Sequence, residues 1–192
     1  MIKLKKGEES MKLALKNVII LSCIILLSNT LLAEGLTLKS KDISGQISLN
    51  QVFNGFGCNG KNISPQLQWS NPPKGTKSFA VTIYDPDAPT GSGWWHWVIF
   101  DIPKGTHQIV SNASALNRLP KGSIQSKTDF GKSEFGGACP PKGSQAHAYI
   151  ATVYALDIEK LGLDKDANPA LVGFMLNSHT IEKSSLIAYY KR

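Results

Sequence analysis

The sequence lacks the motifs of several common enzyme and nucleic-acid-binding classes. It contains neither a Gly-x-Ser-x-Gly nor a His-Glu-x-x-His segment, which argues against an elbow-type serine hydrolase and a zinc protease. It also lacks zinc-finger, helix-turn-helix and RNA-binding signatures, so nucleic acid is not a favoured partner. No motif indicates a bound cofactor or metal ion.

Charged residues make up only 18% of the 192 residues, and 42% are hydrophobic, which fits one globular domain of ordinary size. Removing residues 1–33 takes away five lysines and two glutamates and lowers the formal charge from +7 to +4. The remaining lysines are scattered through expected turns rather than gathered on one face. The charge therefore gives no sign of a polyanionic partner.

The sequence has no long hydrophobic run suited to spanning a membrane. Its one apolar run, from Val18 to Leu27, follows five lysines and precedes the small residue Ala33. This pattern predicts a secretory signal peptide over 1–33, cleaved near Ala33, and a single mature domain over 34–192 in the periplasm or secreted. Met11 is an alternative start, because the segment from Met11 onward is a complete signal by itself. Cys23 lies within the run and is a poor lipoprotein signal.

Short stretches rich in β-branched and aromatic residues predict most of the strands. The strongest are 78–84, 95–102 and 147–156, and weaker ones are 36–38, 66–69 and 186–190. Four irregularly spaced Pro-Lys-Gly tripeptides fit turns between such strands. We therefore predict a mainly β protein, an antiparallel β-sandwich with one or two peripheral helices.

The expected helices lie toward the C-terminus. Asn168 as N-cap and Pro169 at the first helical position predict a helix that buries Leu171, Phe174, Met175 and Ser178 at a sheet edge. A shorter helix is expected over 157–163. Residues 111–137 lack periodicity, so we expect a long surface loop there.

A stiff turn carries the first group of candidate site residues. Pro86 and Pro89 restrict the backbone around Asp85 and Asp87, and a cis peptide bond is compatible with this segment. His96 follows among Trp94, Trp95 and Trp97, which we expect to form core and pocket wall.

The second group begins the strand over 147–156. His147 and Tyr149 lie two residues apart, so strand alternation places them on the same face. If this strand lies near the one that begins with His96, two imidazoles, a phenol and Asp85 converge, and the preceding glycines add backbone amides. That combination predicts a small anion-binding site.

The sequence resembles the phosphatidylethanolamine-binding proteins, also called Raf kinase inhibitor-like proteins, and among them the exported bacterial branch. The resemblance rests on Phe56-Gly57-Cys58, Asn62-Ile63-Ser64-Pro65-Gln66-Leu67-Gln68-Trp69, Asp85-Pro86-Asp87-Ala88-Pro89, Trp95-His96-Trp97 and His147-Ala148-Tyr149.

The resemblance implies an antiparallel β-sandwich with a shallow pocket at one end for phosphate-like anions and phospholipid head groups. The implied pocket residues are Asp85, Asp87, His96, the turn Cys139-Pro140-Pro141, His147 and Tyr149. Many eukaryotic members carry Arg where this chain has Ala148, so a nearby positive charge is missing. Strand alternation points that position away from the pocket.

Two cysteines, Cys58 and Cys139, remain in the mature chain and predict a disulfide in an exported protein. In the chain-entropy model, closing that loop is worth about 4.5 kcal/mol. The alternative is two unrelated buried thiols.

Three functional hypotheses follow. The favoured one is a non-enzymatic binding protein for a phosphate-bearing small molecule or phospholipid head group, acting as an inhibitor or modulator of a kinase or protease, with at most peripheral membrane contact. The second is a metal-dependent or other hydrolase, because His96, His147 and Asp85 resemble a facial metal triad. The third is a surface-mediated interaction protein with a vestigial pocket, including a homodimer built on the aromatic rim.

The titration of the candidate histidines predicts a pH dependence. Both have ordinary pKa values near 6.5 by type, so anion affinity should rise as pH falls toward 6. A phosphate monoester that retains a proton, or an ethanolamine ammonium, could pair with the aspartates.

Overall fold

The computed structural model describes residues 35–192. The expected signal peptide over 1–33, with Met11 and Cys23, lies outside the described residues. The described part is mainly β with one helix, α2, over Pro169–His179. The strands are β1 (Thr37–Lys39), β2 (Gly45–Gln46), β3 (Asn54–Gly55), β4 (Cys58–Asn59), β5 (Leu67–Ser70), β6 (Ser78–Asp85), β7 (Trp94–Pro103), β8 (Gln108–Ile109), β9 (Ile124–Gln125), β10 (His147–Leu156) and β11 (Thr180–Tyr190).

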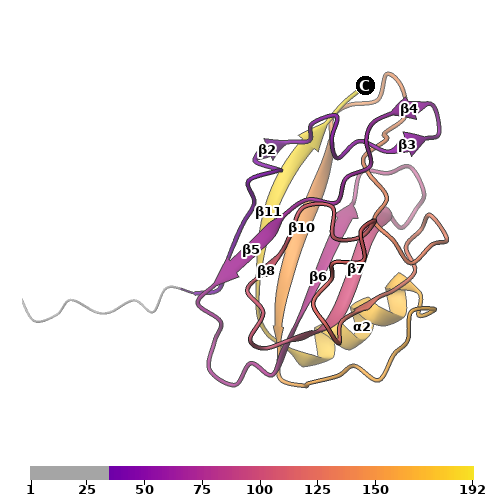
Figure 1. Ribbon diagram of the computed structural model, residues 1–192. Coiled ribbons are helices and arrows are strands. Elements are labelled where there is room, and N and C mark those ends of the chain that lie inside the picture. The colour runs from indigo at the N-terminus through magenta and orange to yellow at the C-terminus, as the bar shows by residue number, and fades with distance from the viewer. Residues whose placement is uncertain (1–34) are drawn as a thin grey trace, which may run out of the picture. The chain divides into compact units, whose positions relative to one another are not determined.

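Two sheets face each other. The larger has the order β2-β11-β10-β6-β7-β9, with antiparallel pairing throughout except for the short parallel pair of β2 and β11. The smaller sheet has the order β1-β5-β8, and β3 and β4 form a separate hairpin. Figure 1 shows β11, β10, β6 and β7 side by side, with β5 and β8 lying over them. The predicted antiparallel sandwich is confirmed.

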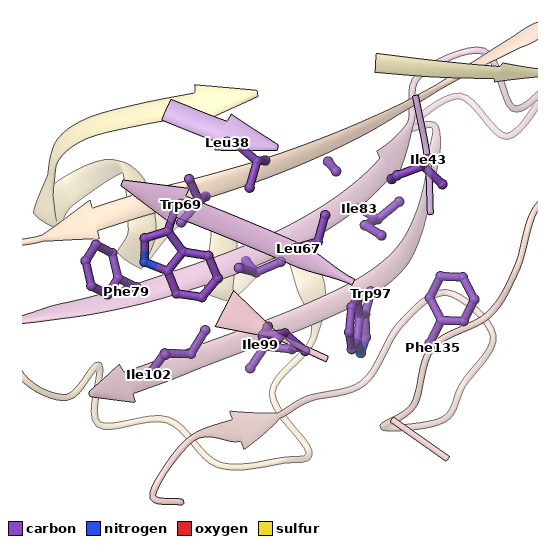
Figure 2. Close-up of a cluster of buried hydrophobic side chains, with 14 of the residues drawn as sticks. Leu38, Ile43, Leu67, Trp69, Phe79, Ile83, Trp97, Ile99, Ile102 and Phe135 are labelled. Atoms are coloured by element: carbon purple, nitrogen blue, oxygen red, sulfur yellow. The ribbon is translucent and has the colours of Figure 1, made fainter. Parts of the chain in front are cut away.

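The main core lies between the two sheets. Leu38, Leu67 and Trp69 of the smaller sheet pack against side chains of the larger sheet such as Phe79 and Ile99 (Figure 2). The rings of Trp69 and Phe79 lie 5.4 Å apart between centroids. Strand β6 is buried along nearly its whole length instead of alternating, because both faces of the larger sheet are covered there.

Helix α2 covers part of the opposite face of the larger sheet. Val172 and Leu176 join a second cluster of buried side chains with Val98 and Phe100 of β7. The Asn168 side chain accepts a hydrogen bond from the Leu171 amide at 2.9 Å, which confirms the predicted N-cap. Within residues 35–192, no helix is long and apolar enough to cross a membrane.

The predicted buried face of this helix is wrong except for Met175, which packs partly buried against the second cluster, and its predicted position at a sheet edge is wrong. Leu171 and Phe174 are 42% and 66% exposed, whereas Val172 and Leu176 are almost fully buried. Apolar residues occur on several sides of the helix, so their spacing alone is compatible with more than one buried face. Packing against the sheet selects the face of the helix that carries Val172 and Leu176.

Three further expectations are corrected. No helix forms over 157–163, because the Leu161 amide donates to the Asp101 carboxylate at 2.8 Å and Leu161 is drawn into the second cluster. The segment 111–137 is more than a surface loop, since it contains β9 and the buried side chain of Phe135. No cis peptide bond occurs in the part of the chain that the structure describes.

Candidate functional site

A pocket of about 160 Å³ lies where β6 ends and where β7 and β10 begin. These three chain positions lie at one end of the larger sheet because the strands are antiparallel neighbours, with Tyr84 opposite both Trp95 and Ile150. The lining residues are Phe56, Asp85, Ala88, Pro89, Thr90, Trp94, His96, Phe130, Cys139, Pro140, Pro141, His147 and Tyr149.

The structure brings together seven of the eight residues expected in the pocket. The exception is Asp87, which is exposed and absent from the lining. Its backbone amide donates to Asp85 Oδ1 at 2.8 Å, and its Oδ2 accepts from the Ala148 amide at 2.7 Å. Asp87 therefore holds the stiff turn against the start of β10 and positions its neighbours.

Asp85 and His147 form a buried pair. Nδ1 of His147 lies 2.8 Å from Oδ2 of Asp85. His147 is only 5% exposed and Asp85 only 3%. An ionised carboxylate can only accept, so Nδ1 donates and Nε2 is the ring nitrogen left for a ligand. With Asp87 bound to Oδ1, both carboxylate oxygens of Asp85 are engaged.

His96 is held in one tautomer. Its Nδ1 lies 2.7 Å from the Gly136 carbonyl oxygen, which can only accept, so the proton is on Nδ1. Nε2 is buried and has no hydrogen-bond partner among the described residues. Burial lowers the pKa of His96 to about 4. The expectation that His96 titrates near pH 6.5 is therefore wrong.

Tyr149 adds a second buried polar atom. Its hydroxyl makes no hydrogen bond of ordinary geometry in the described part of the chain, although Asp85 and the Cys139 backbone lie close enough to interact with it. Burial, and then the charge of Asp85, raise the pKa of Tyr149, so the hydroxyl keeps its proton and can donate to a ligand. The rings of His96 and Tyr149 pack edge to face at 5.0 Å between centroids.

The glycines before the second half of the site position the chain but supply no amide to a ligand. The Gly136 amide donates to the His96 carbonyl at 2.9 Å, and the Gly137 amide donates to Asn62 Oδ1 at 2.7 Å. A Cβ atom at Gly137 would lie 2.3 Å from the Gln51 carbonyl oxygen. The expectation that both amides face an anion is therefore wrong, and close packing explains the need for glycine at 137.

Aromatic rings form the outer wall of the pocket. Trp94 lies there as expected, while Phe56 and Phe130 were not identified from the sequence. Their rings stack at 5.9 Å between centroids, and Phe56 is 69% exposed. The Phe56-Gly57-Cys58 motif could have indicated Phe56. Phe130 lies in a segment without any periodic signal.

The wall turn 139–141 is tied to the β3–β4 hairpin in two ways. Cys58 and Cys139 form a disulfide with an S–S distance of 2.08 Å, as predicted. The Arg192 guanidinium, which the sequence did not indicate, donates to the Pro140 carbonyl at 2.7 Å and the Gly57 carbonyl at 2.8 Å. The disulfide and the hydrogen bonds of Arg192 thus fix one wall of the pocket.

The geometry does not favour a metal triad. Across residues 35–192, no group of three or more His, Cys, Asp or Glu side chains is placed to hold a metal ion. Asp85 uses both carboxylate oxygens on His147 and Asp87, and His96 turns Nδ1 to a carbonyl. The hydrolase hypothesis therefore loses the ligand set on which it rested.

Comparison with known proteins agrees with this architecture. The phosphatidylethanolamine-binding protein family model matches residues 41–191. The UPF0098 protein YbcL of Escherichia coli K12 is 49% identical over 148 residues, covering 76% of this chain and 81% of YbcL. The UPF0098 protein YbhB of the same strain is 51% identical over 140 residues, covering 72% of this chain and 88% of YbhB.

The crystal structure of E. coli YbcL, described as a new member of the mammalian PEBP family, superposes with a TM-score of 0.80 at 46% identity. The match covers 82% of this chain and 98% of that one. Together, the matched sequence over nearly all of the described residues and the shared sandwich show that the chain belongs to the phosphatidylethanolamine-binding protein family.

Proposed function

We propose that this family member, a binding protein rather than an enzyme, holds the phosphate group of a small molecule or phospholipid head group in its pocket and thereby modulates a protein target such as a kinase or protease. One observation carries the proposal. Four polar side chains, Asp85, His96, His147 and Tyr149, meet in a mostly apolar pocket, and two of them leave buried polar atoms without an ordinary hydrogen bond among the described residues. An unmet buried polar group costs about 1–3 kcal/mol, which a ligand that hydrogen-bonds these atoms would recover.

The chemistry of the floor suits a phosphate group. Phosphate oxygens can accept from the Tyr149 hydroxyl and, when His147 is protonated, from its Nε2. The Asp85 carboxylate accepts from Nδ1 and leaves Nε2 for the ligand. The aromatic wall of Phe56, Trp94 and Phe130 then surrounds the organic part of the ligand.

The disulfide supports export. Disulfides form and persist in oxidising compartments, and the Cys58–Cys139 bond lies in the pocket wall itself. With the signal-like segment over 1–33, this supports a proposal that the protein works in the periplasm or outside the cell.

Titration of methyl phosphate into the exported, disulfide-bonded protein by calorimetry tests the proposal. His147→Gln and Asp85→Asn each remove one partner of the buried pair, and we expect each to weaken binding about 10- to 100-fold. His179→Gln is a matched control, because His179 also pairs with an aspartate, Asp157, at 2.9 Å but outside the pocket. That variant should bind like the unaltered protein.

The proposal fails if methyl phosphate and phospholipid vesicles do not bind, or if the pocket variants bind as well as the control. A protein target that is still bound after both His96 and His147 are replaced would favour a vestigial pocket.

A further inference from the structure

The floor of the pocket has an unusual balance of hydrogen-bonding groups. Both oxygens of Asp85 are engaged, and the amides of Gly136 and Gly137 are used within the fold. The groups left for a ligand are Nε2 of His96, the Tyr149 hydroxyl and Nε2 of His147. Nε2 of His96 accepts as long as its imidazole is neutral, whereas Nε2 of His147 donates only when that ring carries a proton on both nitrogens.

His96 is a neutral hydrogen-bond acceptor because of the groups that surround its ring. The Gly136 carbonyl holds the proton on Nδ1, so Nε2 carries the lone pair. Phe130 packs on the ring from the loop side and Tyr149 from β10. The charged and titratable groups nearby are Asp85 on β6, which raises the pKa of His96, and His147 on β10, which lowers it, and burial is the largest effect and keeps the imidazole neutral.

His96 lines both the pocket and a separate cavity of about 10 Å³, whereas Gly136, which binds Nδ1, lines only that second cavity. The two ring nitrogens point in diverging directions, so Nε2 lies on the side of the ring that lines the pocket with Asp85 and His147. A ligand that enters the pocket therefore meets a buried acceptor with no partner.

We propose that the pocket selects a phosphate monoester in its singly protonated form, with the P–OH group donating to Nε2 of His96 while other phosphate oxygens accept from Tyr149 and His147. The inference rests on the proposed function and narrows it from any phosphate group to one that carries a proton. Phosphodiesters and sulfate esters have no such proton and bind weakly.

The physical reason is the mismatch that an unprotonated ligand creates. A bare phosphate oxygen next to Nε2 places two lone pairs against each other and leaves both groups unsatisfied. Sites built to bond a hydroxyl reject analogues that lack it. We expect at least a tenfold preference for the protonated ligand.

Methyl phosphate and methyl sulfate are the matched probes. Near pH 5.5 both are monoanions of similar shape, and they differ by the proton on one oxygen. Calorimetric titration of the unaltered protein should show at least tenfold tighter binding of methyl phosphate. Its affinity should fall about tenfold per pH unit above the second pKa of the ester, which is about 6.

Methylphosphonate separates the proton of the ligand from that of His147. Its second pKa is higher than that of methyl phosphate, so the midpoint of the affinity profile should move upward with the ligand. A midpoint that stays fixed would report a protein group and would overturn the inference.

A variant and a lipid comparison complete the test. His96→Phe removes the acceptor and should abolish the preference over methyl sulfate, whereas His179→Phe should keep it. Vesicles with phosphatidic acid, a monoester, should bind if the source is a lipid, and phosphatidylethanolamine vesicles, which carry a diester, should not. Binding of soluble methyl phosphate without binding to either vesicle identifies a free monoester.

The outcomes distinguish the two proposals. Equal binding of methyl phosphate and methyl sulfate, with a flat profile from pH 5.5 to 8, overturns the selection of protonated ligands and leaves a general anion pocket. Absence of binding by all of these probes overturns both. Because the ligand and pH comparisons use the unaltered protein, they stand even if His96→Phe does not fold.

Discussion

At the scale of single residues, His96 shows how burial changes the role that a residue type suggests. Its place among tryptophans identified it as a site residue, and the structure places it in the pocket. Its ordinary pKa suggested a positive donor for anions. Burial keeps it neutral, and the bond from Nδ1 to Gly136 leaves Nε2 as an acceptor instead. That difference depends on the surrounding strands and loops, which local sequence does not specify.

The lowered pKa of His96 predicts a pH dependence of stability. In the unfolded chain the imidazole takes up a proton as pH falls below 6.5, while in the folded protein it stays neutral until about pH 4. The unfolded state therefore binds more protons in this window, so stability falls as pH falls, by about 3 kcal/mol in total. Above pH 6.5 the contribution disappears.

Denaturant unfolding between pH 4 and 7 measures this effect. His96→Phe should be less stable overall, because the Gly136 carbonyl loses its donor, but its stability should fall less steeply with acid. His179→Phe should keep the slope of the unaltered protein. Identical slopes for all three proteins would contradict the assigned pKa shift.

At the scale of elements, the start of α2 was predictable and its buried face was not. Asn168 and Pro169 act locally, through a cap bond and a fixed φ, so the start of the helix can be recognised from neighbouring residues alone. The choice between apolar faces depends on the sheet beneath. That information lies in β6 and β7, far away in the sequence.

The corrected face predicts unequal costs for two truncations on α2. Leu176→Ala should lower the free energy of unfolding by about 2–5 kcal/mol, because it leaves a cavity between helix and sheet. Phe174→Ala should change it by no more than about 0.5 kcal/mol, because that ring is 66% exposed. Urea unfolding of the two variants decides the matter, and a larger loss for Phe174→Ala would refute the observed packing.

The strands show the same division between local and distant causes. β6, β7 and β10 are rich in β-branched and aromatic residues and lie close to where they were expected. The first half of β11 escaped notice because Glu182, Lys183 and Ser184 do not resemble a strand. It is extended because every residue except Ile181, at a register shift, pairs with β10, and Glu182 also accepts from the Leu36 amide at 2.9 Å.

At the scale of the whole molecule, the pocket is assembled from distant segments. Asp85, His96, His147 and Tyr149 belong to two local motifs, and each motif could be recognised from its own residue pattern. The wall residues Phe56 and Phe130 and the clamp by Arg192 depend on long-range contacts. Such contacts leave no periodic signal, which explains why sequence reasoning missed them.

The disulfide and Arg192 hold the same wall, and this predicts a coupled response to their removal. The double change Cys58→Ser and Cys139→Ser should cost about 2–5 kcal/mol of stability, because the unfolded chain gains freedom. Affinity for methyl phosphate should fall only a few-fold, because Arg192 still bridges Pro140 and Gly57. Arg192→Ala alone should likewise have a small effect on affinity, since the disulfide remains.

Combining the three substitutions should weaken binding by more than the product of the separate effects, because both side-chain links between the β3–β4 hairpin and the turn 139–141 are then lost. Calorimetry on the four proteins, each checked for folding by circular dichroism, gives the coupling directly. Purely multiplicative effects would mean that the two links act independently and that the wall is held by its own packing. A coupled loss would show that the fold secures its ligand pocket by two alternative ties, one covalent and one made of hydrogen bonds.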